Sequence, residues 1–493
     1  MFISNKRLGL VTDFVNNLCM LCGALPIPSQ YSHAQIEFLN FVLQGLLITN
    51  SLSWAAFEAY SLKERTCAAL SWSFRKSEID WDSLLHASIQ HTINLYAITE
   101  VTLVIDDTDN SRSKNTSEIS GVHKIKDKKT GGFMMGQEIV TLIMVSKNGV
   151  TAPAFSDFYM PDPLVTEWHQ NEKRRKKTKM ETAKEEKKVP KPESRPEYPT
   201  KGQIAQNLIA KFKEQFPSIK VRAILADCAY GHRPFVSAAT EIYPEAQLVS
   251  QLSKSCIVLE ANEEISLAEC FKNKEATTLN INLRYQEKTI HYVAKTLAVR
   301  SHDKQKRMII AMKYEGETEY RYLMATVTSW LPETIIKEYA LRWLVEVFIQ
   351  DWKGQSGWFQ LSKQQGEAAA KQGLILSLLC DHMILSHHDQ IAAHKNKQLA
   401  LTAGSIREQL IAESLYEFIS EIVLSENPHE RLAIVAEKIK QHFKLKNSLR
   451  HIRELEVERV VLQRKTETVK KALNKIIREA QKAEAKALPR ETN

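Results

Sequence analysis

The sequence predicts an α/β protein in which a mixed sheet is flanked by helical N- and C-terminal domains. Two apolar, β-branched runs, at 101–107 and 221–227, each end in aspartate, as buried strands of such sheets often do. The segments before residue 98 and after residue 353 have helical patterns without strand alternation. With 493 residues, the chain is too long for one compact core, so we expect several domains.

Between 99 and 252 the pattern predicts three strands, followed by alternating helices and strands. Strands at 138–146 and 150–159 are expected to form a hairpin, because Asn148 and Gly149 lie between them and Asn-Gly favours a tight turn. A helix is expected at 203–214. A meander extended by parallel strands through crossover helices gives a mixed sheet.

Charge is concentrated in two segments of an otherwise ordinary composition. The chain is 43% hydrophobic and 25% charged, with a formal net charge of +9, and these are values of a globular protein. Residues 171–189 contain nine Lys/Arg against four Glu, and residues 444–493 contain fourteen Lys/Arg against seven Glu. Such segments suit a polyanion, although a solvated face explains each run equally well.

The sequence favours a cytoplasmic protein without a membrane anchor. The N-terminus lacks the layout of a signal peptide, and no uninterrupted apolar run is long enough to span a bilayer. The seven cysteines are odd in number and irregularly spaced, which indicates a reducing compartment. The lone Cys19–Cys22 pair is expected to belong to a core, because it cannot complete a zinc site alone.

The most informative pattern is formed by Tyr339, Arg342, Glu346 and Lys353. A continuous helix would place them in one stripe about 60° wide, with apolar residues opposite. Gly354 follows directly, where we expect the helix to end. A carboxylate beside two cations and a phenol suits a metal ion next to a phosphodiester. A solvated polar face is the alternative.

Three carboxylates are candidate metal ligands and catalytic residues. Asp107 and Asp227 end the two predicted strands, and Glu346 lies on the helix. Three carboxylates at one point repel each other unless divalent cations lie between them. Two Mg²⁺ ions about 3.5–4 Å apart are the known device for in-line attack on a phosphodiester. Asp106 remains an alternative to Asp107 as the first ligand.

These motifs, in this order, resemble those of the DDE transposases of the bacterial insertion-sequence family numbered four. The segment YALRWLVEVFIQDWK resembles the family's YREK signature, IDDT its first catalytic Asp and LADCAYG its second. The resemblance covers about 100–355. It implies a ribonuclease-H-like core, with two Mg²⁺ ions (or Mn²⁺ as a substitute) held by Asp107, Asp227 and Glu346. It also implies that Tyr339, Arg342 and Lys353 contact DNA.

The implied activity is cut-and-paste DNA transposition. The expected partners are double-stranded DNA, as transposon terminal inverted repeats and as target DNA, and a second copy of the chain in a synaptic homodimer. Cleavage through a hairpin intermediate would use an aromatic side chain, in a β-rich insertion at 253–330, to stack on a flipped base. Tyr322 is the candidate and Trp330 the runner-up, with a core tyrosine as the equal alternative.

The expected domains follow from these patterns. They are a helical DNA-end-binding domain at 1–98, a first part of the catalytic core at 99–252 with a basic loop at 165–202, the insertion at 253–330, a second core part at 331–390, and a helical domain with a basic tail at 391–493. Two rivals remain: a nuclease of the same fold that cuts without joining, and a catalytically silent DNA-binding derivative.

Overall fold

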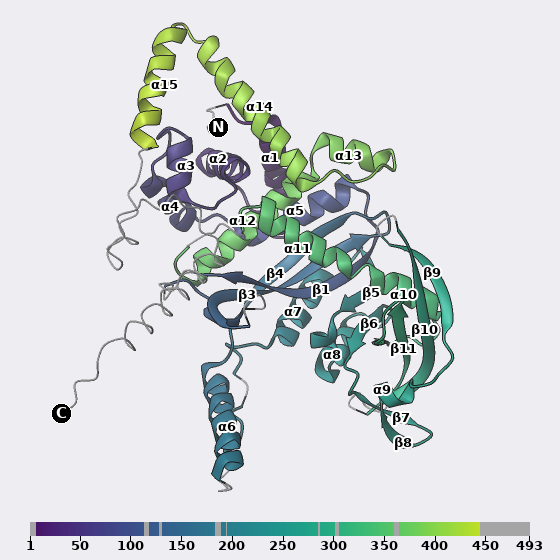
Figure 1. The fold of residues 1–493 in the computed structure, drawn as a ribbon. Coiled ribbons are helices and arrows are strands. Elements are labelled where there is room, and N and C mark those ends of the chain that lie inside the picture. The colour runs from purple at the N-terminus through teal and green to yellow at the C-terminus, as the bar shows by residue number, and fades with distance from the viewer. Residues whose placement is uncertain are drawn as a thin grey trace, which may run out of the picture. The chain divides into compact units, whose positions relative to one another are not determined.

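The structure is a computed structural model that describes residues 6–112, 118–127, 131–182, 189–193, 195–283, 286–300, 305–358 and 364–443. The chain divides into two units, Met1–His442 and Phe443–Asn493, and the fold described below is that of the first. It is a mixed α/β fold (Figure 1), as predicted. The basic tail expected after residue 443 lies outside the described residues.

Twelve strands of the described residues form one mixed sheet, in which β4 and β9 branch from the main path. The path runs β2-β3-β1-β5-β6-β12-β11-β10-β7-β8, with β4 paired to β3 and β9 paired to β10. The strands of its first half are β1 (Glu100–Ser111), β2 (Val122–Lys126), β3 (Phe133–Ser146), β4 (Thr151–Tyr159), β5 (Lys220–Ala226) and β6 (Gln247–Leu252). β1 is antiparallel to β3 and parallel to β5, and β5 is parallel to β6.

The predicted elements of this half are confirmed. β3 and β4 form the expected hairpin, and Gly149 has a φ of 85°, a left-handed conformation that glycine adopts without strain. The predicted helix at 203–214 is α7 (Lys201–Gln215), which leads into β5, and α8 (Arg233–Ile242) leads into β6. Both helices therefore serve as crossovers between parallel strands.

The second half of the sheet is the β-rich region expected at 253–330. It comprises β7 (Ile257–Glu260), β8 (Glu263–Ser266), the short helix α9 (Leu267–Cys270), β9 (Thr277–Leu283), β10 (Gln286–Val299), β11 (Lys306–Tyr314) and β12 (Arg321–Ala325). These strands continue the sheet, because β12 pairs antiparallel with β6, with Tyr322 opposite Leu252. The core and the insertion thus share one hydrogen-bonded sheet.

Helices at both ends of the chain, where helical patterns predict them, form a second hydrophobic core that they share, although separate domains were expected. The N-terminal helices are α1 (Gly9–Gly23), α2 (His33–Thr49), α3 (Trp54–Tyr60), α4 (Cys67–Lys76) and α5 (Trp81–Leu95). They pack against α12 (Glu367–Leu385) and α14 (Ala403–Val423). α13 (His388–Lys395) and α15 (Pro428–His442) complete the described C-terminal helices. The terminal segments thus support one another.

Helix α12 joins the two cores. Leu374 and Leu378 belong to the core of the sheet, whereas Leu376 and Leu379 belong to the helical core. Among the described residues α12 is also the one helix long and apolar enough to cross a membrane, but 67% of its apolar window is buried inside the protein. Its apolar character is explained by this packing.

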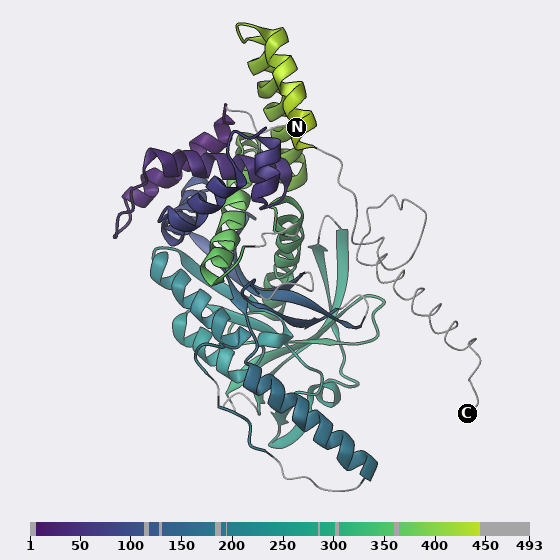
Figure 2. The same cartoon turned by 90° about the vertical axis from the view of Figure 1, so that its left-hand side faces the viewer.

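The prediction of a basic loop at 165–202 is wrong, because this segment is not entirely a loop. α6 (Pro163–Thr182) occupies much of it and extends away from the sheet (Figure 2). Asp162 accepts a hydrogen bond from the Leu164 backbone N–H, Pro163 suits the first position of a helix, and Lys, Arg, Glu and Gln have high helix propensity. The run of charges predicts a loop, but the helix propensity of its residues favours a helix.

Candidate active site

The candidate site lies where β5 ends beside the middle of β1. Ile105 of β1 is opposite Ala226 of β5, so the next residue of each strand, Asp106 and Asp227, lies at the same level. β5 ends at Ala226, one residue before its predicted end at Asp227, and β1 continues beyond its predicted end at Asp107 to Ser111 because its last residues pair with β3. The acidic residues of β1 are therefore held within the sheet.

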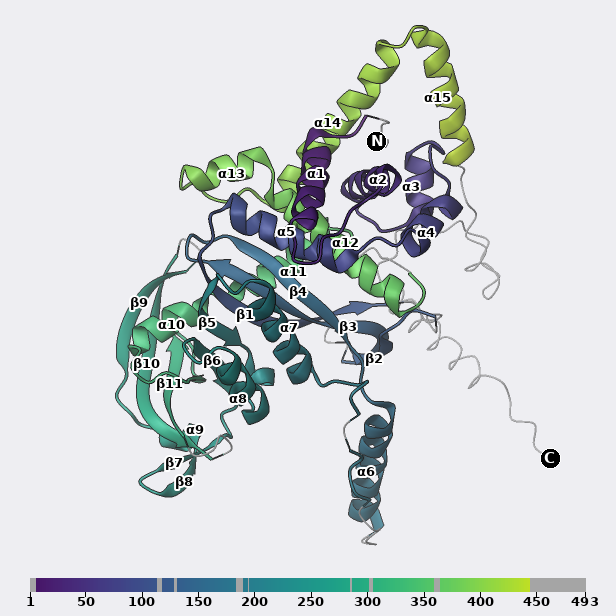
Figure 3. The same ribbon diagram turned by 180° about the vertical axis from the view of Figure 1, so that it is seen from behind.

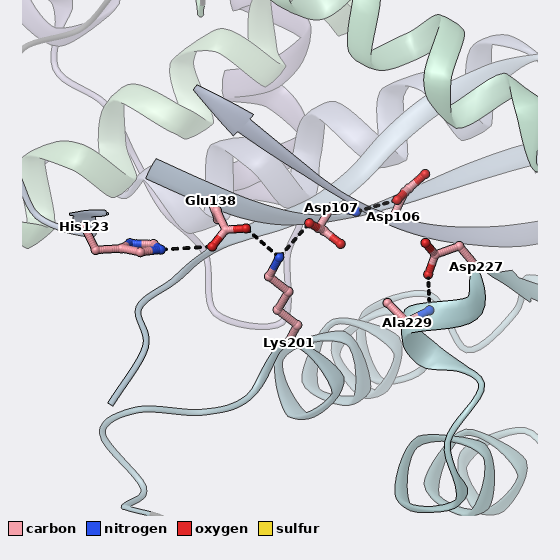
Figure 4. Close-up of polar contacts among 7 residues, drawn as sticks. All are labelled: Asp106, Asp107, His123, Glu138, Lys201, Asp227 and Ala229. Carbon is pink, nitrogen blue, oxygen red and sulfur yellow. Dashed lines mark hydrogen bonds and ion pairs between the residues drawn. The ribbon is translucent and has the colours of Figure 1, made fainter. Parts of the chain in front are cut away.

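A tight turn fixes Asp227. Its Oδ1 accepts a hydrogen bond of 2.8 Å from the Ala229 backbone N–H (Figure 4), within the 3-10 turn η1 (Cys228–Tyr230). A Cβ atom on the following Gly231 would lie 2.6 Å from the backbone oxygen of Gln251. Only glycine allows β6 to approach the turn this closely.

Asp106 and Asp107 point to opposite faces of the sheet, because side chains alternate along a strand. Asp106 Oδ2 lies 3.1 Å from Arg342, on the face covered by α11 (Trp343–Gln355). Asp107 Oδ2 lies 2.7 Å from the Lys201 ammonium, on the face covered by α7 (Figures 1 and 3). The sequence left these two aspartates as alternatives, and the structure places both beside Asp227.

The predicted helix through Tyr339 and Lys353 is interrupted. Tyr339 belongs to α10 (Pro332–Ala340), and α11 begins after Arg342. In the turn between the helices, the Arg342 backbone N–H donates to the Tyr339 carbonyl at 3.0 Å, an i to i+3 bond that replaces the regular helical bond. The prediction that α11 ends at Gly354 is also wrong, since it ends at Gln355.

Arg342 connects Glu346 to the strand tips. Its guanidinium lies 2.6 Å from Glu346 Oε1, one helical turn further along α11, and 3.1 Å from Asp106 Oδ2. A planar guanidinium binds two carboxylates in a fixed geometry. The helix carboxylate and the strand carboxylates, far apart in sequence, are thereby brought into one cluster.

Lys353 and its neighbours anchor the other end of α11. The Lys353 ammonium donates a hydrogen bond to the backbone oxygen of Asp109 in β1. Trp352, which is fully buried, stacks on Trp358 with ring centroids 5.2 Å apart and an angle of 7° between the planes. Its indole N–H donates to Ser377 Oγ at 3.1 Å. α11 is therefore rigidly packed beneath its polar face.

Two tyrosine hydroxyls near the carboxylates are buried without a hydrogen-bond partner among the described residues. They belong to Tyr339 and Tyr230. Burial raises the pKa of Tyr339 to about 12, and the charges of Asp227 and Asp106 also act to raise it. A buried hydroxyl normally has a partner. The Tyr339 hydroxyl therefore suits a polar group brought by a substrate.

The sequence did not single out a further group, formed by Lys201, Glu138 and His123. The Lys201 ammonium lies 2.7 Å from both Asp107 Oδ2 and Glu138 Oε1 (Figure 4). His123 Nε2 lies 2.9 Å from the other oxygen of Glu138. Burial tends to raise the pKa of Glu138, but the hydrogen bonds from His123 and Lys201 outweigh it and lower this pKa to about 2.

The cluster contains more carboxylates than cations. Among the described residues, Lys201 and Arg342 are the cations of the cluster, and the carboxylates are those of Asp106, Asp107, Glu138, Asp227 and Glu346. Burial, assisted by the charge of Asp227, raises the pKa of Asp106 to about 6. Burial also raises the pKa of Asp227, with Asp107 contributing. Excess negative charge on hard oxygen ligands fits divalent cations.

The three predicted ligands do not converge tightly in this structure. The group of His, Cys, Asp or Glu ligand atoms that lie within 4.8 Å of one another, in the part of the chain described, is His387, His388 and Asp389 at the start of α13. Asp107, Asp227 and Glu346 form no such group. Lys201 and Arg342 bind two of these carboxylates instead.

The two candidate stacking aromatics are both engaged within the fold. Tyr322 is only 6% exposed, and its ring lies 5.9 Å from that of Phe271. To stack on a base, Tyr322 would have to leave this packing, which agrees with the core alternative. Trp330 is half-buried beneath the Arg222 guanidinium, 5.1 Å from its ring centre.

Comparison with models of known protein families finds no match for this chain. A search of curated proteins also finds no match.

Proposed function

We propose that this protein is a metal-dependent DDE transposase that cleaves transposon ends and joins them to target DNA. The observation that carries the proposal is the arrangement of carboxylates from three separate segments. Asp107 of β1 and Asp227 lie beside each other at adjacent parallel strands, and Arg342 links Glu346 of α11 to Asp106, the neighbour of Asp107. This is the arrangement that the three sequence motifs imply.

The order of the sheet supports a ribonuclease-H-like core. Within the larger sheet, β4-β3-β1 is an antiparallel meander, and β5 and β6 extend it in parallel through α7 and α8. The strands from β7 to β12 lie in the sequence between this core and α11. The third carboxylate therefore follows a β-rich insertion, as the resemblance implies.

The carboxylates of Asp107, Asp227 and Glu346 would hold two Mg²⁺ ions, or Mn²⁺ in their place. Bound metal ions supply activation of the attacking oxygen and stabilisation of the leaving oxygen. Their oxygen-only donor set suits these hard cations. Asp106 is the alternative first ligand, because it is the aspartate that shares Arg342 with Glu346.

The remaining motif residues would bind the DNA end. Arg342 has the fork geometry that matches phosphate oxygens, and the ammonium of Lys353 lies at the opposite end of the same helix face. The partnerless hydroxyl of Tyr339 would bind the terminal nucleotide. Tyr322 and Trp330 stay candidates for base stacking in a hairpin step.

The expected partners are terminal inverted repeats, target DNA and a second copy of the chain in a synaptic homodimer, with no membrane involved. Among described residues, Lys173 and Lys176 on α6 are exposed cations suited to DNA phosphates. The cellular location expected for such an enzyme is the bacterial cytoplasm.

The proposal is tested with purified protein and duplex oligonucleotides that carry the inverted repeats flanking its gene. We expect Mg²⁺-dependent nicking at the repeat end that is lost in the Asp227→Ala variant, while binding of the same duplex persists. Binding without cleavage by the wild type would identify a silent DNA-binding derivative. Absence of both specific binding and cleavage would overturn the proposal.

A further inference from the structure

We propose that Lys201 is a resident counter-ion that holds Asp107 in the metal-free protein and transfers to Glu138 when a divalent cation binds. On this proposal, Lys201 and Glu138 together set the affinity of the site for the cation. The inference deepens the proposed function and rests on it, because it assumes that Asp107 is a metal ligand.

The first support is geometric. The Lys201 ammonium lies at the same distance, 2.7 Å, from Asp107 Oδ2 and from Glu138 Oε1 (Figure 4). The bond to Asp107 can therefore be lost while the bond to Glu138 stays. A small rotation of a flexible side chain is enough, since lysine has four rotatable side-chain bonds.

The second support is that Glu138 is prepared to keep the ammonium. Its second oxygen accepts from His123 Nε2 at 2.9 Å, and His123 Nδ1 lies 3.0 Å from the Gly121 backbone oxygen. The histidine thus has an oxygen acceptor beside each ring nitrogen. Glu138 itself lies on β3, opposite Asp109 of β1, so the sheet fixes its backbone. Lys201 has a rigid alternative partner.

The third support is that the backbone of Lys201 is fixed, whereas its side chain spans the gap to the sheet. Lys201 is the first residue of α7, and Thr200 and Gln203 form a capping box that closes this end of the helix. A capping box fixes the first helical turn. The ammonium also lies 5.3 Å from the centre of the Tyr159 ring, which suits a cation.

The fourth support is electrostatic. An ammonium ion in contact with Asp107 occupies space that a divalent cation on the same carboxylate would need. It also neutralises the negative charge that attracts the cation. The absence of a tight carboxylate group around Asp107 in the described residues agrees with this competition. Metal binding and the Lys201–Asp107 ion pair therefore compete for the same carboxylate.

The test measures Mn²⁺ affinity by electron paramagnetic resonance, which reports free Mn²⁺ without requiring activity. Lys201→Met removes the competitor, so we expect about tenfold tighter binding, equivalent to about 1.4 kcal/mol. Glu138→Gln removes the alternative partner and should weaken binding about tenfold. Lys211→Met is the matched control, because it removes a cation from the same helix that pairs with Asp82, and its affinity should equal that of wild type.

The double variant Lys201→Met/Glu138→Gln distinguishes transfer of the Lys201 ammonium to Glu138 from a general electrostatic effect of the Glu138 charge on the site. If Glu138 acts by holding Lys201, its substitution has little effect once the lysine is absent, so the double variant should bind as tightly as Lys201→Met. Strictly additive effects, or no change in Lys201→Met, would overturn the inference. Each variant must give a circular dichroism spectrum identical to that of wild type. Lys201→Arg keeps the charge and is the conservative comparison, which should not tighten Mn²⁺ binding.

Failure of the inference is distinguishable from failure of the proposed function. Asp227→Asn should abolish Mn²⁺ binding in every background. If wild type binds Mn²⁺ in an Asp227-dependent manner but the Lys201 and Glu138 variants do not differ from it, only the inference is wrong. If wild type shows no Asp227-dependent binding, the proposed metal site is wrong as well.

Discussion

At the scale of single residues, the choice between Asp106 and Asp107 decides how the site is built. The two neighbours face α11 and α7 respectively, and each binds a different cation. Asp107 shares its face with Lys201, and Asp106 shares Arg342 with Glu346. Both aspartates lie beside Asp227, so substitution of each one in turn distinguishes their roles.

We predict that Asp107→Ala lowers the rate of DNA cleavage by about 10³-fold or more, because a metal ligand is lost, while DNA binding persists. Asp227→Ala and Glu346→Ala should behave alike. Asp106→Ala should retain more activity, since its partner Arg342 still binds Glu346. Single-turnover cleavage of end-labelled DNA measures each rate. A dead Asp106→Ala variant beside an active Asp107→Ala variant would exchange their roles.

A second prediction at this scale concerns the cations of α11. Arg342→Lys keeps the charge but loses the fork that holds two groups at once, and Lys353→Ala removes the ammonium at the far end of the helix. Both should slow hairpin formation or strand transfer by about tenfold more than the first nick, if the later steps require a firmly held DNA end. Time courses that resolve each product provide the measurement. Equal slowing of all steps would indicate a general role in affinity.

At the scale of elements, the sequence predicts those helices, strands and turns that depend on local patterns of residues. The hairpin around Gly149, the crossover helix α7 and the strand before Asp227 follow from turn chemistry and periodicity. Two errors have local physical causes. The run of charges in α6 predicts a loop, although its residues have high helix propensity. The turn at Arg342 interrupts a helix whose sequence pattern keeps helical spacing. Arg342 itself keeps helical dihedral angles in this turn, with φ −54° and ψ −32°.

Contacts between distant elements could not be predicted. Lys201 is 94 residues from Asp107 and 63 from Glu138 in sequence, and nothing in a single sequence connects them. The capping residues Thr200 and Gln203 indicate where α7 begins, but not which strand faces its first turn. That information comes from the order of β3, β1 and β5 in the sheet.

The third prediction concerns α6. Deleting 173–188, part of which lies outside the described residues, should weaken DNA binding and reduce the slope of log affinity against log salt. Each lost phosphate contact should lower the magnitude of this slope by about 0.9. Fluorescence anisotropy across a salt series measures both quantities. An unchanged slope would show that the basic segment faces solvent rather than DNA.

At the scale of the whole molecule, the helical layer and the sheet are held together by buried polar bonds as well as apolar packing. His382 of α12 is fully buried, and its Nε2 lies 2.8 Å from the Pro153 carbonyl of β4 while its Nδ1 lies 2.6 Å from Ser88 Oγ of α5. The carbonyl can only accept, so Nε2 carries the proton and Nδ1 accepts from the hydroxyl. This is the arrangement of the neutral imidazole, which burial favours.

We therefore predict that the contribution of His382 to stability is lost in mild acid. Burial lowers the pKa of His382 to about 4, below the ordinary value of about 6.5 in the unfolded chain. The unfolded state binds the proton more readily, so the contribution is fully present above pH ~6.5 and declines by about 1.4 kcal/mol per pH unit as the pH falls towards 4. Urea unfolding between pH 4.5 and 7.5 should show a smaller pH dependence in His382→Gln than in wild type. Equal pH dependence would contradict this assignment.

The proposed transposase differs from a nuclease in that its carboxylate cluster joins DNA as well as cutting it. The most direct test supplies a pre-cleaved inverted-repeat end with a free 3′-OH, a supercoiled plasmid and Mg²⁺, and measures covalent joining of the labelled end to the plasmid. We predict joined product with the wild type and none with Glu346→Ala. Efficient metal-dependent cleavage with no joined product would contradict the claim and identify a nuclease.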